Sequence, residues 1–193
     1  ISGVSSVCEG FPIGNFTSIT PASGGVSGLN NGGAITYSWE YSINGGPYSV
    51  IGGANGSTYN SGIIIPPGST YSFFRRATDR CGNTAFSNVI TVVGRPTPNG
   101  ALSPTTQTTC PGSIPYVTLN FTPGTGPFDI SLTNGITKTG VNNGDTLQLA
   151  PGTYDFASIT DVYGCNRTSG FTSGAQILQA QGITFGLSKV DAS

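Results

Sequence analysis

The sequence predicts an all-β protein made of two tandem immunoglobulin-like β-sandwich domains, each with one intradomain disulfide. Three observations lead to this expectation. The stretch PGSTYSFFRRATDRC at 67–81 recurs in outline as PGTYDFASITDVYGC at 151–165. The 193 residues include 30 glycines and 13 prolines, which disfavour helices. Segments of alternating apolar and polar residues, separated by turn residues, run along the chain.

The repeat defines the expected domain boundaries. It returns after about 80 residues, a period too long for a solenoid and right for small tandem β-domains. We therefore expect a first domain at 1–94, a linker at 95–100, a second domain at 101–178 and a C-terminal segment at 179–193. Two prolines at alternate linker positions, Pro96 and Pro98, favour an extended, semi-rigid spacer.

The clearest strand of the first domain lies at 35–42, where four large apolar residues alternate with polar ones. Such alternation places the apolar side chains on one face of a sheet. Asn44-Gly45-Gly46 then predicts a hairpin turn into a partner strand at 47–51. The other expected segments are an extended piece at 4–12, a short strand at 18–20, crossing segments at 58–59 and 63–65, and strands at 70–78 and 88–93.

Aromatic residues on the inward-facing positions are predicted as core anchors. Trp39 is the only tryptophan and lies in the middle of the clearest strand, where residues on both sides alternate cleanly. We interpret it as the core anchor of a sandwich, with a sugar-stacking platform as the alternative interpretation. The other predicted anchors are Tyr37, Tyr71, Phe73, Tyr154 and Phe156.

The second domain shows the same kind of alternation. Thr133-Asn134-Gly135 predicts a hairpin turn between two of its strands. Several good helix formers follow one another at 175–180, but six residues cannot sustain an isolated helix. The expected strands are 116–121, 128–132, 136–139, 146–149 and 153–160.

The segment 179–193 lies beyond the repeat. Ile183, Phe185 and Leu187 alternate as in a strand. Three interpretations stay open: a closing strand of the second domain, the start of a third domain, or a strand donated to a neighbouring chain. Donation would make the protein a self-assembling fibre subunit.

The four cysteines follow the repeat. Cys8 and Cys81 flank the first repeat unit, and Cys110 and Cys165 flank the second. Only the pairing Cys8–Cys81 with Cys110–Cys165 keeps each bridge within one unit, so we predict this pairing, with each bridge contributing about 4 kcal/mol on the chain-entropy model. A zinc site is the competing interpretation, which the lack of C-x-x-C spacing and of histidine disfavours. Disulfides indicate an oxidising compartment, outside the cytosol.

Composition argues against several function classes. Charged residues make up 8% of the chain and the net charge is −1, so no basic surface for nucleic acid or an anionic membrane is expected. No apolar run approaches the roughly 18 residues of a membrane span, so direct membrane insertion is not expected. Histidine is absent, and neither a carboxylate pair nor a Gly-x-Ser-x-Gly elbow is evident, so we expect no enzyme and no cofactor. The absence of methionine predicts a processed chain or a piece of a longer one.

Polar residues near the ends of the repeat are the remaining site candidates. Asp79 with Asn83, and Asp161 with Asn166, are candidate oxygen ligands for Ca²⁺. The alternative is that each aspartate bonds the backbone of its own turn. The adjacent arginines at 75–76 should point to opposite faces of their strand, with one in solvent and the other paired with Glu40 or Asp79.

The order of motifs resembles a known class of repeat. The first domain contains YSWEYSINGG at 37–46, IGGA at 51–54, YSFFRR at 71–76 and SNVITVV at 87–93. This order resembles the Ig-like and PKD-like repeats of very large secreted cell-surface adhesins of the Bacteroidota, of the gliding-motility type. Segments of the second domain, GTGPF at 124–128 and GTY through TDVYGC at 152–165, resemble a second repeat of the same adhesins.

The resemblance implies a non-catalytic, extracellular structural or adhesive module of a cell-surface adhesin or filament. Its implied partners are neighbouring domains or subunits of the same assembly. A self-assembling fibre subunit and a carbohydrate-binding module that contacts surface glycans are the alternatives. Asp145-Thr146-Leu147 is similar to the O-glycan acceptor of these bacteria, which makes Thr146 a candidate for O-glycosylation.

Overall fold

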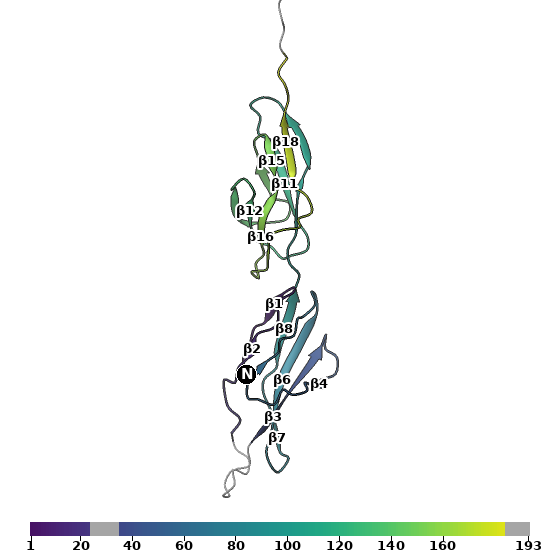
Figure 1. Ribbon diagram of the computed structural model, residues 1–193, viewed down its shortest axis with the longest axis vertical. Helices are drawn as coiled ribbons and strands as arrows, with labels where there is room; N and C mark the ends of the chain where they lie inside the picture. Colours follow the sequence, from purple (N-terminus) through teal and green to yellow (C-terminus); the bar gives the residue numbers. More distant parts are fainter. Residues whose placement is uncertain (24–34, 184–193) are drawn as a thin grey trace, which may run out of the picture. The chain divides into compact units, whose positions relative to one another are not determined.

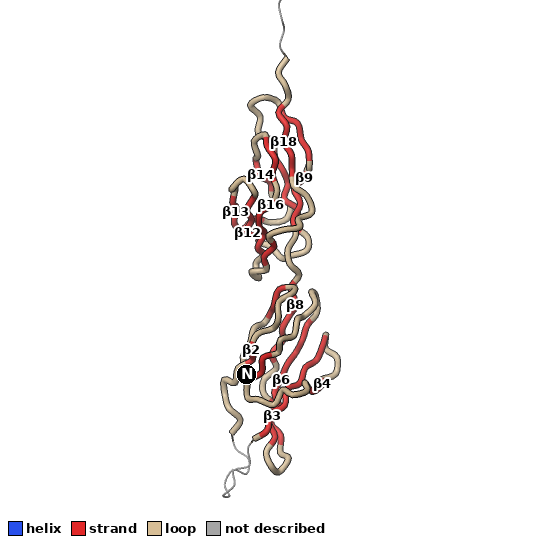
Figure 2. Tube along the Cα trace, in the orientation of Figure 1, coloured by secondary structure: helices blue, strands red, loops and turns tan. Residues whose placement is uncertain are grey.

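A computed structural model of the chain describes residues 1–23 and 35–183. The chain divides into two compact units, Ile1–Thr97 with Tyr163–Cys165, and Pro98–Val162 with Asn166–Ser193. Over the described ranges the secondary structure consists of strands joined by turns and loops, without a helix (Figure 2). Consequently no described segment is a helix long and apolar enough to cross a membrane.

The described part of the first unit forms one large and one small sheet (Figure 1). The large sheet has the order β1-β8-β6-β3-β4, and β7 pairs with β6 beside this path. The small sheet pairs β2 with β5. The bounds are β1 Ser6–Cys8, β2 Asn15–Phe16, β3 Thr36–Ile43, β4 Ser49–Val50, β5 Tyr59–Asn60, β6 Thr70–Thr78, β7 Thr84–Phe86 and β8 Ile90–Arg95.

The hairpin between β3 and β4 follows from local sequence. Asn44 and Gly45 both have positive φ, of 50° and 75°, and the Gly46 N–H donates to the carbonyl of Ile43 at 2.9 Å. Positive φ at both central residues is the signature of a type I′ turn, whose twist matches that of the two strands. Beyond the turn Tyr41 pairs with Ser49, one residue out of step with the Ile43–Gly46 closing pair.

The core of the first unit lies between its two sheets. Trp39 of β3 and Phe73 of β6 are completely buried, and both contact Phe16 of β2, with ring centroids 5.7 and 4.8 Å apart. Tyr59 of β5 closes the cluster at 5.6 Å from Trp39. Because the buried rings come from both sheets, the first unit is a β-sandwich.

The predicted anchors of the first unit differ in how deeply they lie. Trp39 and Phe73 are 0% exposed, whereas Tyr71 is partly buried and packs against the cluster. Tyr37 is also partly buried, but its ring lies beneath the guanidinium of Arg75, 4.6 Å from the ring centroid.

Over its described residues the second unit contains three sheets, with the orders β10-β18-β15, β14-β11-β9 and β13-β12-β16-β17 (Figure 1). The bounds are β9 Gly100–Ser103, β10 Thr106–Thr109, β11 Tyr116–Phe121, β12 Phe128–Leu132, β13 Thr137–Val141, β14 Thr146–Gln148, β15 Gly152–Tyr154, β16 Phe156–Thr160, β17 Asn166–Arg167 and β18 Ala175–Gln179.

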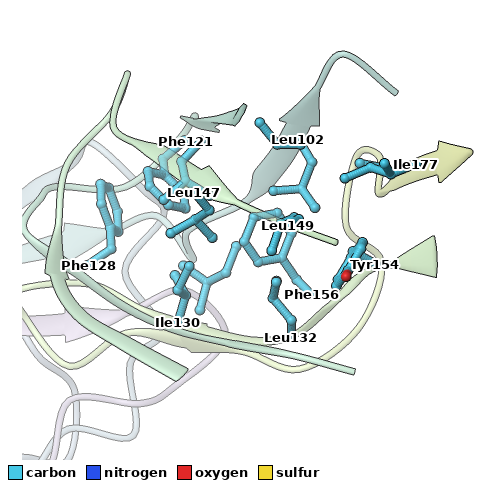
Figure 3. Packing of buried hydrophobic residues seen from close by; sticks show 14 residues of the cluster. Leu102, Phe121, Phe128, Ile130, Leu132, Leu147, Leu149, Tyr154, Phe156 and Ile177 are labelled. Carbon is cyan, nitrogen blue, oxygen red and sulfur yellow. The ribbon is translucent and has the colours of Figure 1, made fainter. Parts of the chain in front are cut away.

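A second core joins these three sheets. Leu102 of β9, Ile130 of β12 and Ile177 of β18 point into it from different sheets (Figure 3). The predicted anchors Tyr154 and Phe156 are 6% and 3% exposed and belong to this cluster. In β11 and β12 every second side chain is buried, as expected of strands with one face on the core.

The repeat strand is built differently in the two units. In the first unit it forms one continuous strand, β6. The single strand predicted at 153–160 is wrong, because the chain breaks at Asp155 into β15, which pairs with β18, and β16, which pairs with β12. The carbonyl of Asp155 instead accepts a hydrogen bond from Thr133 N at 2.9 Å. One sequence motif thus spans two sheets in the second unit.

Other predictions also fail. The short strand predicted at 18–20 is wrong, because the strand in this region is β2, where Phe16 supplies the buried side chain. Residues 100–103 and 106–109 form β9 and β10, which the alternation did not single out. The stretch of helix formers at 175–180, where no isolated helix was expected, is mostly β18, held between β10 and β15. The strand expected from Ile183 onwards lies almost wholly outside the described residues.

Candidate functional site

The cysteines give the clearest correction to the sequence-based expectations. Cys8 is bonded to Cys165, 157 residues away, with a Cα–Cα distance of 5.4 Å. Cys81 and Cys110 are free and exposed. The predicted pairing Cys8–Cys81 with Cys110–Cys165 is therefore wrong for both bridges.

Strand register explains why Cys8 and Cys81 do not meet. Cys8 pairs with Arg95 at the end of β8, and Val93 of β8 pairs with Thr70 at the start of β6. Cys81 follows the other end of β6, which lies about 27 Å along the strand from Thr70 at roughly 3.3 Å per residue. A disulfide requires Cα atoms within about 7 Å. The repeat motif places Cys8 and Cys81 at opposite ends of one sheet.

Cys165 lies in a short segment, Tyr163–Cys165, that belongs to the first compact unit. Within this unit the guanidinium of Arg95 stacks on the ring of Tyr163, 3.7 Å from its centroid. Arg95 is also the strand partner of Cys8, and its carbonyl accepts a hydrogen bond from Glu9 N at 2.8 Å. Cation–π stacking of a partly desolvated arginine contributes about 1–2 kcal/mol. The disulfide and the stacked pair together fix this segment.

The first calcium candidate is an internally bonded turn. One oxygen of Asp79, Oδ1, accepts hydrogen bonds from the N–H groups of Cys81 and Asn83 at 2.9 and 2.8 Å. The other, Oδ2, accepts from the side-chain amide of Asn83 at 2.9 Å. This is the backbone-bonding alternative for the aspartate. The carboxylate fixes the β6–β7 connection.

The second calcium candidate does not repeat this arrangement. Asp161 is 6% exposed. The Asn166 side-chain amide donates to the Thr160 hydroxyl at 2.7 Å, so it turns toward β16. Among the described residues, no three His, Cys, Asp or Glu side chains gather in a group that could hold a metal ion.

The two adjacent arginines occupy opposite faces of β6, but the expectation that one of them is solvated is wrong. Arg76 pairs with Glu40, with Nη2 and Oε1 3.1 Å apart. Arg75 is 5% exposed, and its Nη1 donates to the carbonyl of Ser57 at 2.6 Å. Buried charge is tolerated only with such partners. Arg75 is structural: it holds loop carbonyls against the sheet, beside a cavity of about 270 Å³.

An exposed aromatic group lies on the outer face of the large sheet. Tyr48 contacts Phe74 with ring centroids 4.7 Å apart, and Phe74 contacts Phe86 at 5.7 Å. Tyr48 and Phe86 are 42% and 64% exposed, and Val50 beside them is 56% exposed. We call these four residues, Tyr48, Val50, Phe74 and Phe86, the outer aromatic patch. The Glu40–Arg76 ion pair borders it, because Glu40 pairs across the sheet with both Val50 and Phe74.

Sequence reasoning concentrated on the inward aromatic residues and did not identify the outer aromatic patch. The signal was present in the adjacent pair Phe73-Phe74, since neighbouring strand residues point to opposite faces. Phe73 fills the core, so Phe74 has to lie on the outside. Trp39, the residue weighed as a sugar platform, is completely buried, and its indole N–H donates to the carbonyl of Gly56 at 3.0 Å.

The candidate O-glycan acceptor lies on the surface of the second unit. Thr146 is exposed at the start of β14, whereas the next residue, Leu147, is 7% exposed and belongs to the core. Asp145 accepts a hydrogen bond from Asn142 N at 2.7 Å, which fixes the turn before the strand. The threonine hydroxyl is thus presented at the edge of a rigid strand.

Comparisons with known proteins do not assign the chain to a characterised family. Residues 1–96, just under half of the chain, match a family model described as "Domain of unknown function (DUF8696)". No curated protein matches the chain.

Solved structures match at low similarity. The fibronectin(III)-like modules of Clostridium thermocellum CbhA match at 12% identity and a TM-score of 0.36, over 97% of this chain and 96% of that chain. The N-terminal four Ig domains of Dscam1 isoform 4.44 match at 13% identity and a TM-score of 0.39, over 93% of this chain and 44% of that chain. At these TM-scores the matches assign neither fold nor function.

Proposed function

We propose that the chain is a non-catalytic, extracellular structural or adhesive module of a cell-surface adhesin or filament, built from two tandem immunoglobulin-like β-sandwich domains. The observation that carries the proposal is the disulfide between Cys8 and Cys165. Structural disulfides form and persist in oxidising surroundings outside the cytosol. The bond also closes most of the chain into one covalent loop, so tension applied at the two ends passes through the disulfide and does not extend the loop.

Two further features support a load-bearing role. Each unit has its own apolar core, so each resists unfolding by itself. The connection between the units runs from the end of β8 at Arg95 to the start of β9 at Gly100 and contains two prolines, which stiffen it. A disulfide-closed β-module suits the stalk or surface of a filament.

Surface exposure on the source cells tests the proposal. Intact cells are treated with a protease that cannot enter them, and the released peptides are identified by mass spectrometry. We expect peptides from both units, with the Cys8 and Cys165 peptides joined until a reductant is added. Recovery of the chain only from the cytosolic fraction, with reduced cysteines, would refute the proposal.

A second candidate function is glycan binding at the outer aromatic patch. Exposed aromatic rings stack on the apolar faces of sugars, and the neighbouring Glu40–Arg76 pair offers hydrogen-bonding groups. The test is binding of the wild-type chain to an array of surface glycans, compared with Tyr48→Ala and Phe86→Ala. Phe11→Ala removes an equally exposed ring, 65% exposed, at another place on the first unit and serves as the control. Equal glycan binding by all four proteins would refute a role for the patch.

The fibre-subunit alternative rests on residues 179–193, most of which lie outside the described residues. Gln179 itself ends β18, so truncation after Ile183 leaves the described strands of the second unit intact. Strand donation predicts that the truncated chain loses high-mass assemblies in light scattering. A full-length chain that stays a monodisperse monomer would refute strand donation.

A further inference from the structure

Two of the four cysteines occupy the same place in their units. Cys8 ends β1, which runs parallel to β8, the last strand of the first unit, and pairs with Arg95 at its end. Cys110 directly follows β10, which runs parallel to β18, and the preceding residue Thr109 pairs with Gln179. Each of these cysteines thus lies beside the point where the last described strand of its unit ends. We call Cys8 and Cys110 the exit cysteines.

The local turns around the exit cysteines are also alike. Both occur in Cys-x-Gly, and the glycines, Gly10 and Gly112, have φ of 82° and 80°. In each turn the carbonyl of the cysteine accepts a hydrogen bond at 3.1 Å, from Phe11 N in one case and from Ser113 N in the other. The same backbone geometry therefore surrounds both cysteines, of which Cys8 is partly buried and Cys110 is exposed.

The other two cysteines lie in corresponding connections of the two units. Cys81 lies in the connection from β6 to β7, residues 79–83, and Cys165 lies in the connection from β16 to β17, residues 161–165. Both connections begin with the aspartate of the Thr-Asp pair and contain a glycine with positive φ, Gly82 and Gly164. Cys81 precedes its glycine and is exposed, whereas Cys165 follows its glycine and is completely buried in the disulfide. We call Cys81 and Cys165 the hairpin cysteines.

The disulfide in the structure joins an exit cysteine, Cys8, to a hairpin cysteine from the following repeat, Cys165. This bond leaves one cysteine of each type, the exit cysteine Cys110 and the hairpin cysteine Cys81, and both are free and exposed. We infer that these two thiols are complementary ends of the same kind of bond, so that Cys110 of one copy of the chain bonds to Cys81 of the next. Copies would then be joined covalently by a bond between the same two types of cysteine as the bond within each copy.

The chemistry of this linkage is an ordinary thiol–disulfide exchange with a small disulfide such as oxidised glutathione. The Cys110 thiolate attacks the oxidant, forms a mixed disulfide and releases one glutathione thiol. The Cys81 thiolate of the second copy then attacks the Cys110 sulfur and releases the other. Two protein thiols are oxidised, one glutathione disulfide is reduced to two thiols, and both protein thiol protons are released to solvent or glutathione.

Two exposed-site variants test the inference without disturbing either core. Cys81→Ser retains only the exit thiol, and Cys110→Ser retains only the hairpin thiol. The full-length chains are concentrated in a glutathione redox buffer, and products are separated without reductant. Wild type should form a ladder in steps of 19.6 kDa. Each variant alone should stay monomeric, and an equimolar mixture of the two should form a dimer and nothing larger.

Mass spectrometry identifies the bond that forms. Chymotrypsin cleaves between the two cysteines, for example after Phe86, so the linked peptides are distinguishable. We expect Cys81–Cys110 peptides in wild type and in the mixture, while Cys8–Cys165 remains intact. Wild type that stays monomeric with both thiols reactive would overturn the inference, as would symmetric Cys81–Cys81 or Cys110–Cys110 dimers. The inference rests on the proposed extracellular function only for the oxidant, which this assay supplies, so its failure is separable from failure of the cell-surface experiment.

Discussion

The disulfide predicts how far the chain can extend under force. Only the residues before Cys8 and after Cys165 lie outside the loop that the bond closes. These are about 35 residues, so complete unfolding of the oxidised chain should lengthen it to about 120 Å, at roughly 3.5 Å per residue. Without the bond all 193 residues contribute, and the extended length should be about 680 Å.

Single-molecule force spectroscopy measures this difference, with handles attached at the two chain ends. Cys165→Ser should release about 550 Å more contour length than wild type, because 157 further residues extend at roughly 3.5 Å each. Cys110→Ser is the matched control, since Cys110 is free, and it should leave the wild-type length unchanged.

The same measurement distinguishes the two cysteine pairings. Bridges between Cys8 and Cys81 and between Cys110 and Cys165 would leave about 65 residues extensible, or about 230 Å at roughly 3.5 Å per residue. An extended length near 230 Å for the oxidised wild type would refute the Cys8–Cys165 bond and the load-bearing role argued from it. An extended length that increases in Cys110→Ser would refute them as well.

Three further predictions concern the first unit. Trp39→Phe should lower the free energy of unfolding by about 1–3 kcal/mol in urea titrations, because it removes the indole hydrogen bond and part of a completely buried ring; an unchanged midpoint would contradict this. Burial raises the pKa of Tyr59 above its ordinary value of 10.0, and the neighbouring Tyr41 adds a smaller effect in the same direction. The folded state therefore holds the phenol proton more tightly than the unfolded state. The unfolding free energy should therefore be unaffected by this group below pH 10 and fall as pH rises beyond it, and Tyr59→Phe should flatten that slope; an equal slope in the variant would refute the assignment. A Cβ at Gly94 would meet the backbone carbonyl of Pro66, so Gly94→Ala should lower the free energy of unfolding by about 1–3 kcal/mol. Gly52→Ala is the control and should be nearly neutral, because a Cβ there meets open space. Equal melting temperatures for the two variants would contradict the prediction.

Local chemistry explains which parts of the fold could be predicted. The bounds of β11 and β12 match the expected 116–121 and 128–132, because alternation over five or six residues is a local property of a half-buried strand. The turn at Asn44 and Gly45 was also predictable, since few other residue pairs accept positive φ at both positions. Short strands such as β2 and β5 carry too few residues to show a period.

The sites expected from the sequence differ from the observed ones where a site depends on distances between strands. Asp79 behaves as its sequence context suggests, because its hydrogen bonds are made within four residues. The outer aromatic patch required knowledge of which strands are neighbours, since Tyr48, Phe74 and Phe86 come from three separate segments. A sequence shows which residues face outward from a strand, but the strand order decides which of them form a surface.

By itself the sequence determined that this chain is built of β-strands, that Trp39 and Phe73 lie inside, and that one motif carrying a cysteine occurs twice. Only the tertiary structure decided what that motif does. The motif forms one strand, β6, in the first unit and two strands, β15 and β16, in the second. Of its two cysteines, Cys165 is disulfide-bonded and Cys81 is free. The physical reason is that a disulfide needs two Cα atoms within about 7 Å, a condition set by register and strand order. The repeat suggested two closed units; strand register placed Cys8 and Cys81 at opposite ends of one sheet and joined Cys8 to Cys165.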